Sequence, residues 1–275
     1  MQFISLSIQA NPENSEILIA ELAEVGFDYF EDTKIGFDAF CEEQNYNQAL
    51  VDEIFERYAM LEICVANKAL IEKKNWNEEW EKNFNPVIIN EKCRIRATFH
   101  EYDPQYEFDI LIEPKMSFGT GHHATTASVM RNMFGIDHNQ KRVLDVGCGT
   151  AVLAILAEKL GATEILAFDI DEWSVENAEE NFKLNQSKHI KVLQGNLKQV
   201  APEGLYDIVL ANINRNVLLS EIPAYSALLV ENGVLIVSGF YTHDEADITA
   251  CAIKSGLRKI NEVSENDWMS VVYRK

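Results

Sequence analysis

The order of apolar and polar positions in the N-terminal part of the chain predicts a small α+β domain. Ile4, Leu6 and Ile8 alternate with polar residues, which indicates a half-buried strand. Apolar residues that recur every three or four positions predict helices over 15–25 and 47–58. Further strands are predicted over 27–33, 36–41 and 61–65. The order strand, helix, two strands, helix, strand is typical of a ferredoxin-like domain.

Strands and helices alternate in the later part of the chain, which predicts a parallel sheet with helices on both faces. Strands are predicted over 143–146, 165–169, 190–193, 206–211 and 233–238. Helices are predicted over 124–134, 151–160, 172–185 and 246–255. Two strands are predicted earlier in the chain, over 93–99 and 108–112. The last two strands, 257–263 and 268–273, have only a short link and indicate a closing hairpin. The fold class is therefore α/β, a doubly wound seven-stranded sheet behind a small ferredoxin-like α+β domain.

An aromatic stripe separates these two parts. Trp76, Trp80 and Phe84 recur at every fourth residue and share one face of a helix. We expect this face to pack against a domain, with ligand stacking as the alternative. The chain then divides into residues 1–72, a docking module or a structural appendage, a helical linker over 73–85, and the α/β domain over 86–275.

Composition limits the classes of partner. The chain of 275 residues has 24 basic and 44 acidic residues and a net charge of −20, which disfavours direct nucleic-acid binding and favours a basic protein partner, or else only solubility. No apolar run reaches the roughly 18 residues of a membrane span, and no signal peptide is evident. The five cysteines form no C-x-x-C pair, so we expect a cytoplasmic protein without a disulfide framework or zinc site.

The turn after the strand at 143–146 carries the first candidate chemistry. Gly147 and Gly149 lie between this strand and a helix, where glycine lets a ligand approach the main chain. Asp169 follows Gly149 by 20 residues, the offset of an acid that faces ribose hydroxyls. Val152 replaces the third glycine of a dinucleotide fingerprint, so a nucleoside without phosphates fits better. These features favour S-adenosylmethionine.

A second polar stretch, 114–126, leads into the helix at 124–134. Its glycines and threonines could grip the carboxylate of a methionine moiety through backbone N–H groups and hydroxyls, or merely begin the helix. His122 and His123 are adjacent and have no third ligand nearby in sequence, so no metal site is expected.

Taken together, the segments 118–126, 145–149, 167–171 and 211–213 resemble the bacterial ribosomal protein L11 methyltransferases, the PrmA family. The resemblance implies a cytoplasmic enzyme that uses S-adenosylmethionine to methylate the N-terminal α-amine and lysine ε-amines of that ribosomal protein. It also implies that residues 1–72 recognise the substrate and that 86–275 form the methyltransferase domain. We expect a monomer that does not contact nucleic acid or membrane.

The resemblance assigns cofactor contacts to Thr126, Gly147, Asp169 and Asn212. With their neighbours in the same motifs, the predicted cofactor site comprises Phe118, Gly119, Thr120, Thr126, Gly147, Gly149, Asp169, Ile170 and Asn212. Asn212, at the tip of the strand over 206–211, is also the predicted catalytic residue, as an acceptor for the amine. The chain departs from the family at His122-His123-Ala124, where Thr-His-Pro is usual, and at Ala151, where the family has glycine or another small residue.

Four alternatives stay open. A nucleic-acid or glutamine methyltransferase would commonly carry Asn/Asp-Pro-Pro-Tyr where this chain has 212–215, Asn-Ile-Asn-Arg. A dinucleotide oxidoreductase would need the third glycine. A methyltransferase for another basic protein would keep the same strands, and so would a docking protein without activity. Turnover of the cofactor would distinguish an enzyme from such a docking protein.

Overall fold

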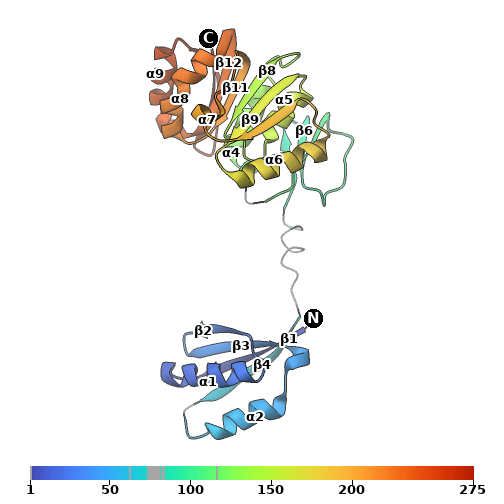
Figure 1. The fold of residues 1–275 in the computed structure, drawn as a ribbon, viewed down its shortest axis with the longest axis vertical. Coiled ribbons are helices and arrows are strands. Elements are labelled where there is room, and N and C mark those ends of the chain that lie inside the picture. The colour runs from blue at the N-terminus through green and yellow to red at the C-terminus, as the bar shows by residue number, and fades with distance from the viewer. Residues whose placement is uncertain (1, 62, 73–80, 82–83, 116) are drawn as a thin grey trace. The chain divides into compact units, whose positions relative to one another are not determined.

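The computed structural model describes the chain except for residues 1, 62, 73–80, 82–83 and 116 (Figure 1). The chain divides into two compact units, residues 1–83 and 84–275. The predicted linker helix, with Trp76 and Trp80, lies outside the described residues apart from Glu81, Phe84 and Asn85.

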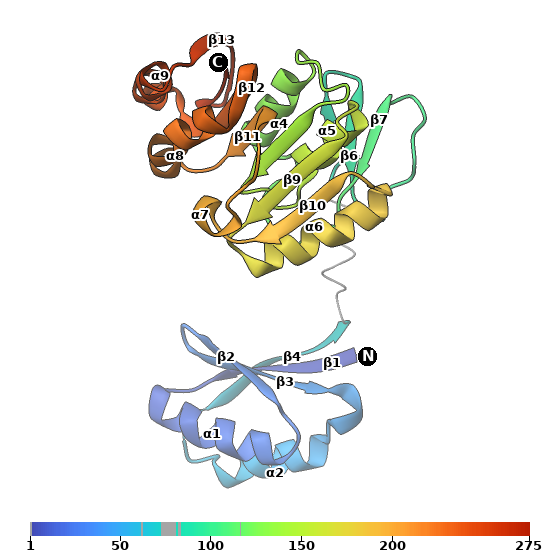
Figure 2. The same cartoon turned by 45° about the horizontal axis from the view of Figure 1, so that its top comes forward.

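The N-terminal unit is a four-stranded antiparallel sheet with two helices on one face (Figures 1 and 2). Its elements are β1 (Gln2–Gln9), α1 (Pro12–Glu24), β2 (Tyr29–Thr33), β3 (Gly36–Glu42), the short η1 (Glu43–Asn45), α2 (Gln48–Arg57) and β4 (Cys64–Glu72). The strand order β2-β3-β1-β4 is that of a ferredoxin-like domain. Leu6 of β1, Leu18 of α1 and Phe37 of β3 are fully or almost fully buried between sheet and helices.

Local sequence explains the helix starts of this unit. The side chain of Asn11 accepts a hydrogen bond from the backbone N–H of Asn14, and Pro12 occupies the first turn of α1, where a missing N–H costs nothing. Asn47 caps α2 in the same way. The prediction for the last strand was wrong in its bounds, 61–65, because β4 is defined by its pairing with the whole of β1, which local periodicity does not reveal.

The C-terminal unit contains a seven-stranded sheet of order β10-β9-β8-β11-β12-β14-β13. Its strand β14 alone runs in the direction opposite to the other six strands. Its strands are β8 (Arg142–Val146), β9 (Glu164–Asp169), β10 (Ile190–Gln194), β11 (Tyr206–Asn212), β12 (Leu229–Tyr241), β13 (Arg258–Glu265) and β14 (Trp268–Arg274). The predicted doubly wound fold with a closing hairpin is confirmed.

Helices cover both faces of this sheet, which gives two separate cores. One core joins the sheet to α4 (Ala124–Met133), α5 (Val152–Lys159) and α6 (Glu172–Asn185). The other core joins it chiefly to α8 (Arg215–Leu228) and α9 (Glu245–Lys254). The short α7 (Leu197–Val200) and η2 (Thr242–Asp244) lie in connections. A separate three-stranded sheet, β5 (Val87–Ile89), β6 (Cys93–Arg96) and β7 (Phe108–Leu111), packs on the first core, and its strand β5 was not predicted.

Helix α8 was also not predicted, and it contains a proline. Pro223 has no N–H to donate to the carbonyl of Leu219 one turn earlier. The thiol of Cys251 on α9 lies 3.5 Å from that carbonyl oxygen and donates to it instead. A contact from a neighbouring helix therefore compensates for the interruption, and Ile222 and Tyr225 are still fully buried on either side of the proline.

Candidate active site

A cleft of about 690 Å³ opens at the carboxyl ends of β8, β9, β10 and β11. This edge is where open α/β sheets bind their ligands. The lining residues come from these strand ends, the loops that follow them, the starts of α6 and α7, α8 and the loop before α4: Ser117, Phe118, Val146, Gly147, Gly149, Phe168, Asp169, Ile170, Asp171, Ser174, Gly195, Asn196, Leu197, Asn212, Ile213, Asn214, Val217 and Glu221.

The turn after β8 that contains Gly147 and Gly149, here named the glycine turn, contacts the polar loop that precedes α4. The backbone N–H of Thr150 donates to the carbonyl of Phe118 at 2.8 Å, and the Thr150 hydroxyl donates to the carbonyl of Gly119 at 2.7 Å. Gly149 has a φ of 54°, and a Cβ there would lie 2.2 Å from the Phe118 carbonyl oxygen. Glycine is therefore required at this position for the loop to close over the turn.

Asp169 is held at the tip of β9 by two backbone donors. Its carboxylate accepts from the N–H of Gly149 at 2.9 Å and from the N–H of Asp171 at 3.0 Å. Each carboxylate oxygen keeps further acceptor capacity toward the cleft. Two neighbouring acceptors of this kind suit the two hydroxyls of a ribose, which donate to them. The exposed apolar side chains of Phe118 and Ile170 flank the same cleft and suit the faces of a base.

Asn212 brings an acceptor without a partner to the cleft. Its Nδ2 donates to the hydroxyl oxygen of Thr126 on α4 at 3.2 Å. Its Oδ1 is buried and has no hydrogen-bond partner among the described residues. Buried acceptors are rarely left unpaired, since this costs roughly 1–3 kcal/mol. The free oxygen therefore indicates a site for a donor that arrives with a ligand.

Two buried polar residues, Asp145 near the end of β8 and Cys148 in the turn that follows it, do not line the cleft. Asp145 is 1% exposed, accepts from the N–H of Ala154, and has one oxygen without a partner among the described residues. Burial raises the pKa of Asp145 from 3.8 to about 7. Burial also raises the pKa of the Cys148 thiol well above its usual value, so this cysteine is neutral. Both side chains belong to the packing beneath the turn.

An aromatic row extends from the mouth of the cleft. Phe118 contacts His123 at 5.2 Å between ring centroids, His123 contacts Trp268 at 4.8 Å, and Trp268 stacks on Tyr241 at 4.1 Å. Trp268 and Tyr241 were not predicted, because only their pairing across β12 and β14 brings them together.

The departures from the family pattern have structural consequences. The side chain of His123 accepts from the N–H of Thr125 and caps α4. The ring of His122 lies 2.8 Å from the carbonyl oxygen of Asn85. Ala151 precedes α5 with a φ of 59°, the left-handed conformation that favours glycine. Its expected entry into the helix was wrong.

The structure brings most of the predicted site residues to one place. Six of them line the cleft: Phe118, Gly147, Gly149, Asp169, Ile170 and Asn212. Thr126 contacts the lining residue Asn212 from behind, and Gly119 contacts Thr150, which follows the lining residue Gly149. The Thr120 hydroxyl instead lies 3.2 Å from the ring of His122. Among the described residues no three His, Cys, Asp or Glu side chains are grouped to hold a metal ion, and no helix is long and apolar enough to cross a membrane.

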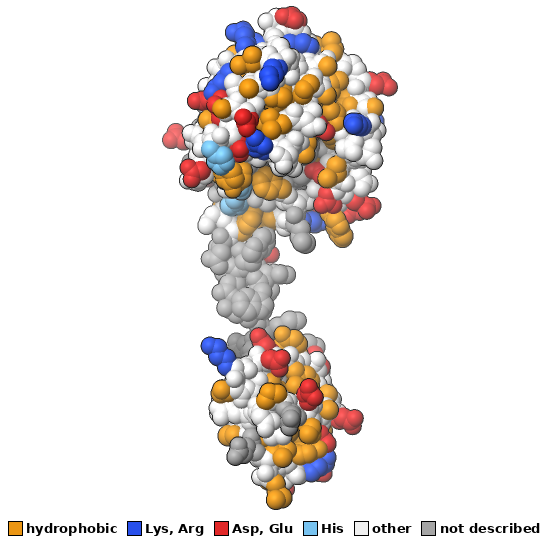
Figure 3. All heavy atoms as spheres, turned by 90° about the vertical axis from the view of Figure 1, so that its left-hand side faces the viewer, with side chains coloured by type: hydrophobic (Ala, Val, Ile, Leu, Met, Phe, Trp, Pro, Cys, Tyr) orange, Lys and Arg blue, Asp and Glu red, His pale blue; other side chains and the backbone are white. Residues whose placement is uncertain are grey.

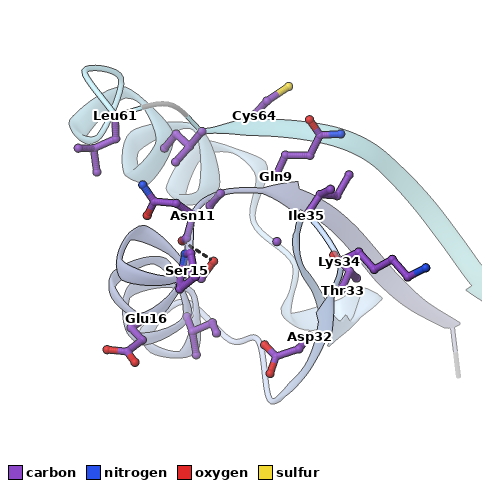
Figure 4. Close-up of a pocket in the computed structure, with 15 residues that line it drawn as sticks. Gln9, Asn11, Ser15, Glu16, Asp32, Thr33, Lys34, Ile35, Leu61 and Cys64 are labelled. Carbon is purple, nitrogen blue, oxygen red and sulfur yellow. Dashed lines mark hydrogen bonds between the residues drawn. The ribbon is translucent and has the colours of Figure 1, made fainter.

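A second hollow, of about 1150 Å³, lies in the N-terminal unit between the start of α1 and the turn from β2 to β3 (Figure 4). The polar groups at its α1 wall satisfy one another, since the Ser15 hydroxyl donates to the Asn11 carbonyl at 2.9 Å. Its charged residues Glu16, Asp32 and Lys34 stand on separate elements and form no catalytic constellation (Figure 4). The chemistry therefore belongs to the cleft of the C-terminal unit.

The order of the seven strands and the cleft at their carboxyl ends define a class I methyltransferase, an enzyme whose methyl donor is S-adenosylmethionine. The present chain is similar to a solved structure described as ribosomal protein L11 methylase from Lactobacillus delbrueckii subsp. bulgaricus. The TM-score is 0.65 and the identity 29%, over 70% of this chain and 100% of that chain. A methyltransferase from Pyrococcus furiosus shares the fold, with a TM-score of 0.51 and 20% identity, over 60% of this chain and 89% of that chain.

Sequence comparison identifies the family. The profile described as ribosomal protein L11 methyltransferase (PrmA) matches residues 3–275. A protein of that name from Porphyromonas gingivalis is 40% identical over 93% of this chain and 89% of its own length. Another, from Phocaeicola vulgatus, is 35% identical over 99% of both chains. The chain belongs to the ribosomal protein L11 methyltransferase family.

Proposed function

We propose that the protein methylates amino groups of ribosomal protein L11, both the N-terminal α-amine and lysine ε-amines. Relatives that are 35–40% identical carry the name of an L11 methyltransferase. The net charge of −20 is complementary to a protein that binds RNA through Lys and Arg. Such a substrate places the enzyme in the cytoplasm.

The free Oδ1 of Asn212 is the observation that supports an amine as the group that receives the methyl group. S-adenosylmethionine supplies a methyl group on a positively charged sulfur, and a neutral nitrogen must approach it in line. The N–H groups of an amine can donate hydrogen bonds to Oδ1 of Asn212. Such a hydrogen bond orients the lone pair of the amine nitrogen. Thr126 fixes the amide from behind, because it accepts from Nδ2 and leaves Oδ1 free to accept a hydrogen bond from the amine. Thr126 then acts through Asn212.

Deprotonation of the amine sets the cost of the reaction. A lysine with a pKa of about 10.4 loses its proton at pH 7 at a cost of roughly 4–5 kcal/mol, whereas an α-amine with a pKa of about 8 costs far less. We place this proton loss to water before the amine binds. The enzyme contributes alignment of nitrogen, methyl carbon and sulfur, which is worth several kcal/mol.

Peptide mapping of L11 after incubation with the enzyme and S-adenosylmethionine tests the amine assignment. We expect methyl groups on the α-amine and on lysines, with faster methylation of lysines at higher pH. Blocking all amines of L11 by prior acetylation should abolish methylation. Methyl groups on glutamine or arginine side chains would contradict the assignment.

A further inference from the structure

Helix α6 carries an asparagine at every fourth position, Asn177, Asn181 and Asn185, so these side chains share one face of the helix. Asn177 and Asn181 are 1% and 0% exposed, and Asn185 is half-buried. Figure 3 shows charged side chains interspersed with hydrophobic ones on the outer surface of this unit. Asparagine is usually found on such a surface, so amides buried along one helix face indicate specific partners.

The partners lie on the outer edge of β7, which α6 contacts (Figure 2). Directly after β7, Ile112 donates its N–H to the Arg96 carbonyl on the β6 side. The backbone groups of successive residues in an extended segment point to opposite sides, so those of Leu111 and Glu113 face α6. Two residues of a strand span about 6.6 Å and four residues of a helix about 6 Å, which matches these positions to successive asparagines.

Asn185 uses both ends of its amide on one residue of β7. Its Oδ1 accepts from the Leu111 N–H at 3.0 Å, and its Nδ2 donates to the Leu111 carbonyl at 2.7 Å. The amide thus satisfies the strand edge as a further strand would. These two hydrogen bonds account for docking of β7 on α6, and they involve no residue of the cleft.

Asn181 instead divides its amide between two segments that border the cleft. Its Oδ1 accepts at 2.8 Å from the N–H of Glu113, which directly precedes the polar loop. Its Nδ2 donates at 3.0 Å to the carbonyl of Thr150, at the end of the glycine turn. Docking of β7 would not require this division, because Asn185 achieves it with a single strand residue.

Thr150 completes the connection on the side of the glycine turn. Its N–H and its hydroxyl donate to the carbonyls of Phe118 and Gly119 in the polar loop. The polar loop is therefore tied to the glycine turn twice, directly at 118–119 and at its start through Asn181. Phe118 and Gly149 both line the cleft, whereas Asn181 does not.

We propose that Asn181 is a positioning residue for S-adenosylmethionine, which holds the polar loop and the glycine turn at the spacing that the cofactor requires. It acts through Glu113 and Thr150 and does not touch the cofactor. Without this amide, both backbone groups lose a buried partner. Binding of the cofactor must then also order the two segments, and this lowers the affinity. The inference concerns the cofactor cleft alone and holds whichever amine receives the methyl group.

Asn181→Ala tests this proposal, with Asn185→Ala as the matched control. Each substitution removes one amide that makes two hydrogen bonds to the backbone, so both should lower the midpoint of thermal unfolding. We expect the Kd for S-adenosylmethionine, measured by calorimetry, to rise roughly tenfold in Asn181→Ala and to stay within about twofold in Asn185→Ala. The KM for the cofactor should follow the Kd, with kcat at saturating cofactor little changed. Equal affinities of the two variants would overturn the proposal.

Hydrogen exchange in the wild type tests the same coupling without a substitution. The N–H groups of Glu113 and Leu111 are bound by Asn181 and Asn185 and report on the two contacts separately. S-adenosylmethionine should slow exchange roughly tenfold or more at Glu113 and within about twofold at Leu111, because a ligand stabilises the contacts to which its binding is linked. Equal slowing at both would mean that the edge of β7 opens as one unit. That result, or no slowing at Glu113, would overturn the role of Asn181 while leaving the methylation of L11 intact.

Discussion

At the scale of residues, the cleft depends on a few groups whose conformations are fixed by backbone hydrogen bonds. Gly149 is needed because the loop carbonyl of Phe118 occupies the space of a side chain. Asp169 is oriented by the N–H groups of Gly149 and Asp171. A carboxylate held in this way can accept hydroxyl groups of a ligand with little loss of side-chain entropy.

We therefore expect Asp169→Asn to weaken binding of S-adenosylmethionine by roughly 10- to 100-fold, since hydrogen bonds to a charged group contribute about 1.5–3 kcal/mol. Isothermal titration calorimetry measures the Kd. Glu172→Gln is the control, because this acid lies in the first turn of α6 and does not line the cleft. Equal affinities of the Asp169 variant and the wild type would remove Asp169 from the cofactor site.

Asp145 predicts an unusual dependence of stability on pH. Burial raises its pKa in the folded protein to about 7, from 3.8. Between these values the folded state binds the proton more tightly than the unfolded state, so the free energy of unfolding decreases as the pH rises through this window. Asp145→Asn, which mimics the protonated acid, should gain stability over the wild type from pH 5 to pH 8, on the order of 2–4 kcal/mol. Urea unfolding at several pH values measures the difference, and parallel pH profiles would contradict the account.

At the scale of elements, the closing hairpin has a turn whose chemistry can be improved. Asn266 and Asp267 link β13 and β14 with φ values of 50° and 65°, as in a type I′ turn. Asp267→Gly should raise the free energy of unfolding by up to about 1 kcal/mol, because glycine adopts this conformation without steric cost. Chemical denaturation measures the change. Asp267→Ala should destabilise the protein, and the reverse order would contradict the turn assignment.

Elements with regular local patterns could be predicted from the sequence, and those defined by distant partners could not. Helix α6 has an Asp171 cap and ends at the predicted residue. Helix α8 escaped prediction, because Pro223 interrupts its pattern and only Cys251, far along the chain, compensates for it. The short strand β5 is recognisable only through its pairing with β6.

The candidate site shows the same division. Gly147, Gly149 and Asp169 follow one another at spacings that a sequence displays. The contact of Thr126 with Asn212 joins residues 86 positions apart. The row through Trp268 depends on a strand pairing at the end of the chain. Spacing therefore indicated the residues of the glycine turn and of the β9 tip, which line the cleft, but not the aromatic row at its mouth.

At the scale of the whole molecule, the net charge of −20 should govern encounter with a basic substrate. An increase in ionic strength from about 0.05 to 0.5 M shortens the Debye length severalfold and screens this attraction. We expect the KM for L11 to rise several-fold over this range, while the Kd for S-adenosylmethionine changes little. Steady-state kinetics at both salt concentrations provide the comparison. A KM independent of salt would contradict electrostatic recruitment.

We expect methyl groups to pass to L11 in the cleft beside Asn212. Intact-mass spectrometry of purified L11, incubated with S-adenosylmethionine and either the wild type or Asn212→Ala, tests it most directly. We expect L11 to gain mass in methyl-sized steps with the wild type, and far more slowly with the variant. No gain with the wild type while it binds S-adenosylmethionine would contradict L11 as the substrate, and equal rates for both proteins would contradict the role of Asn212.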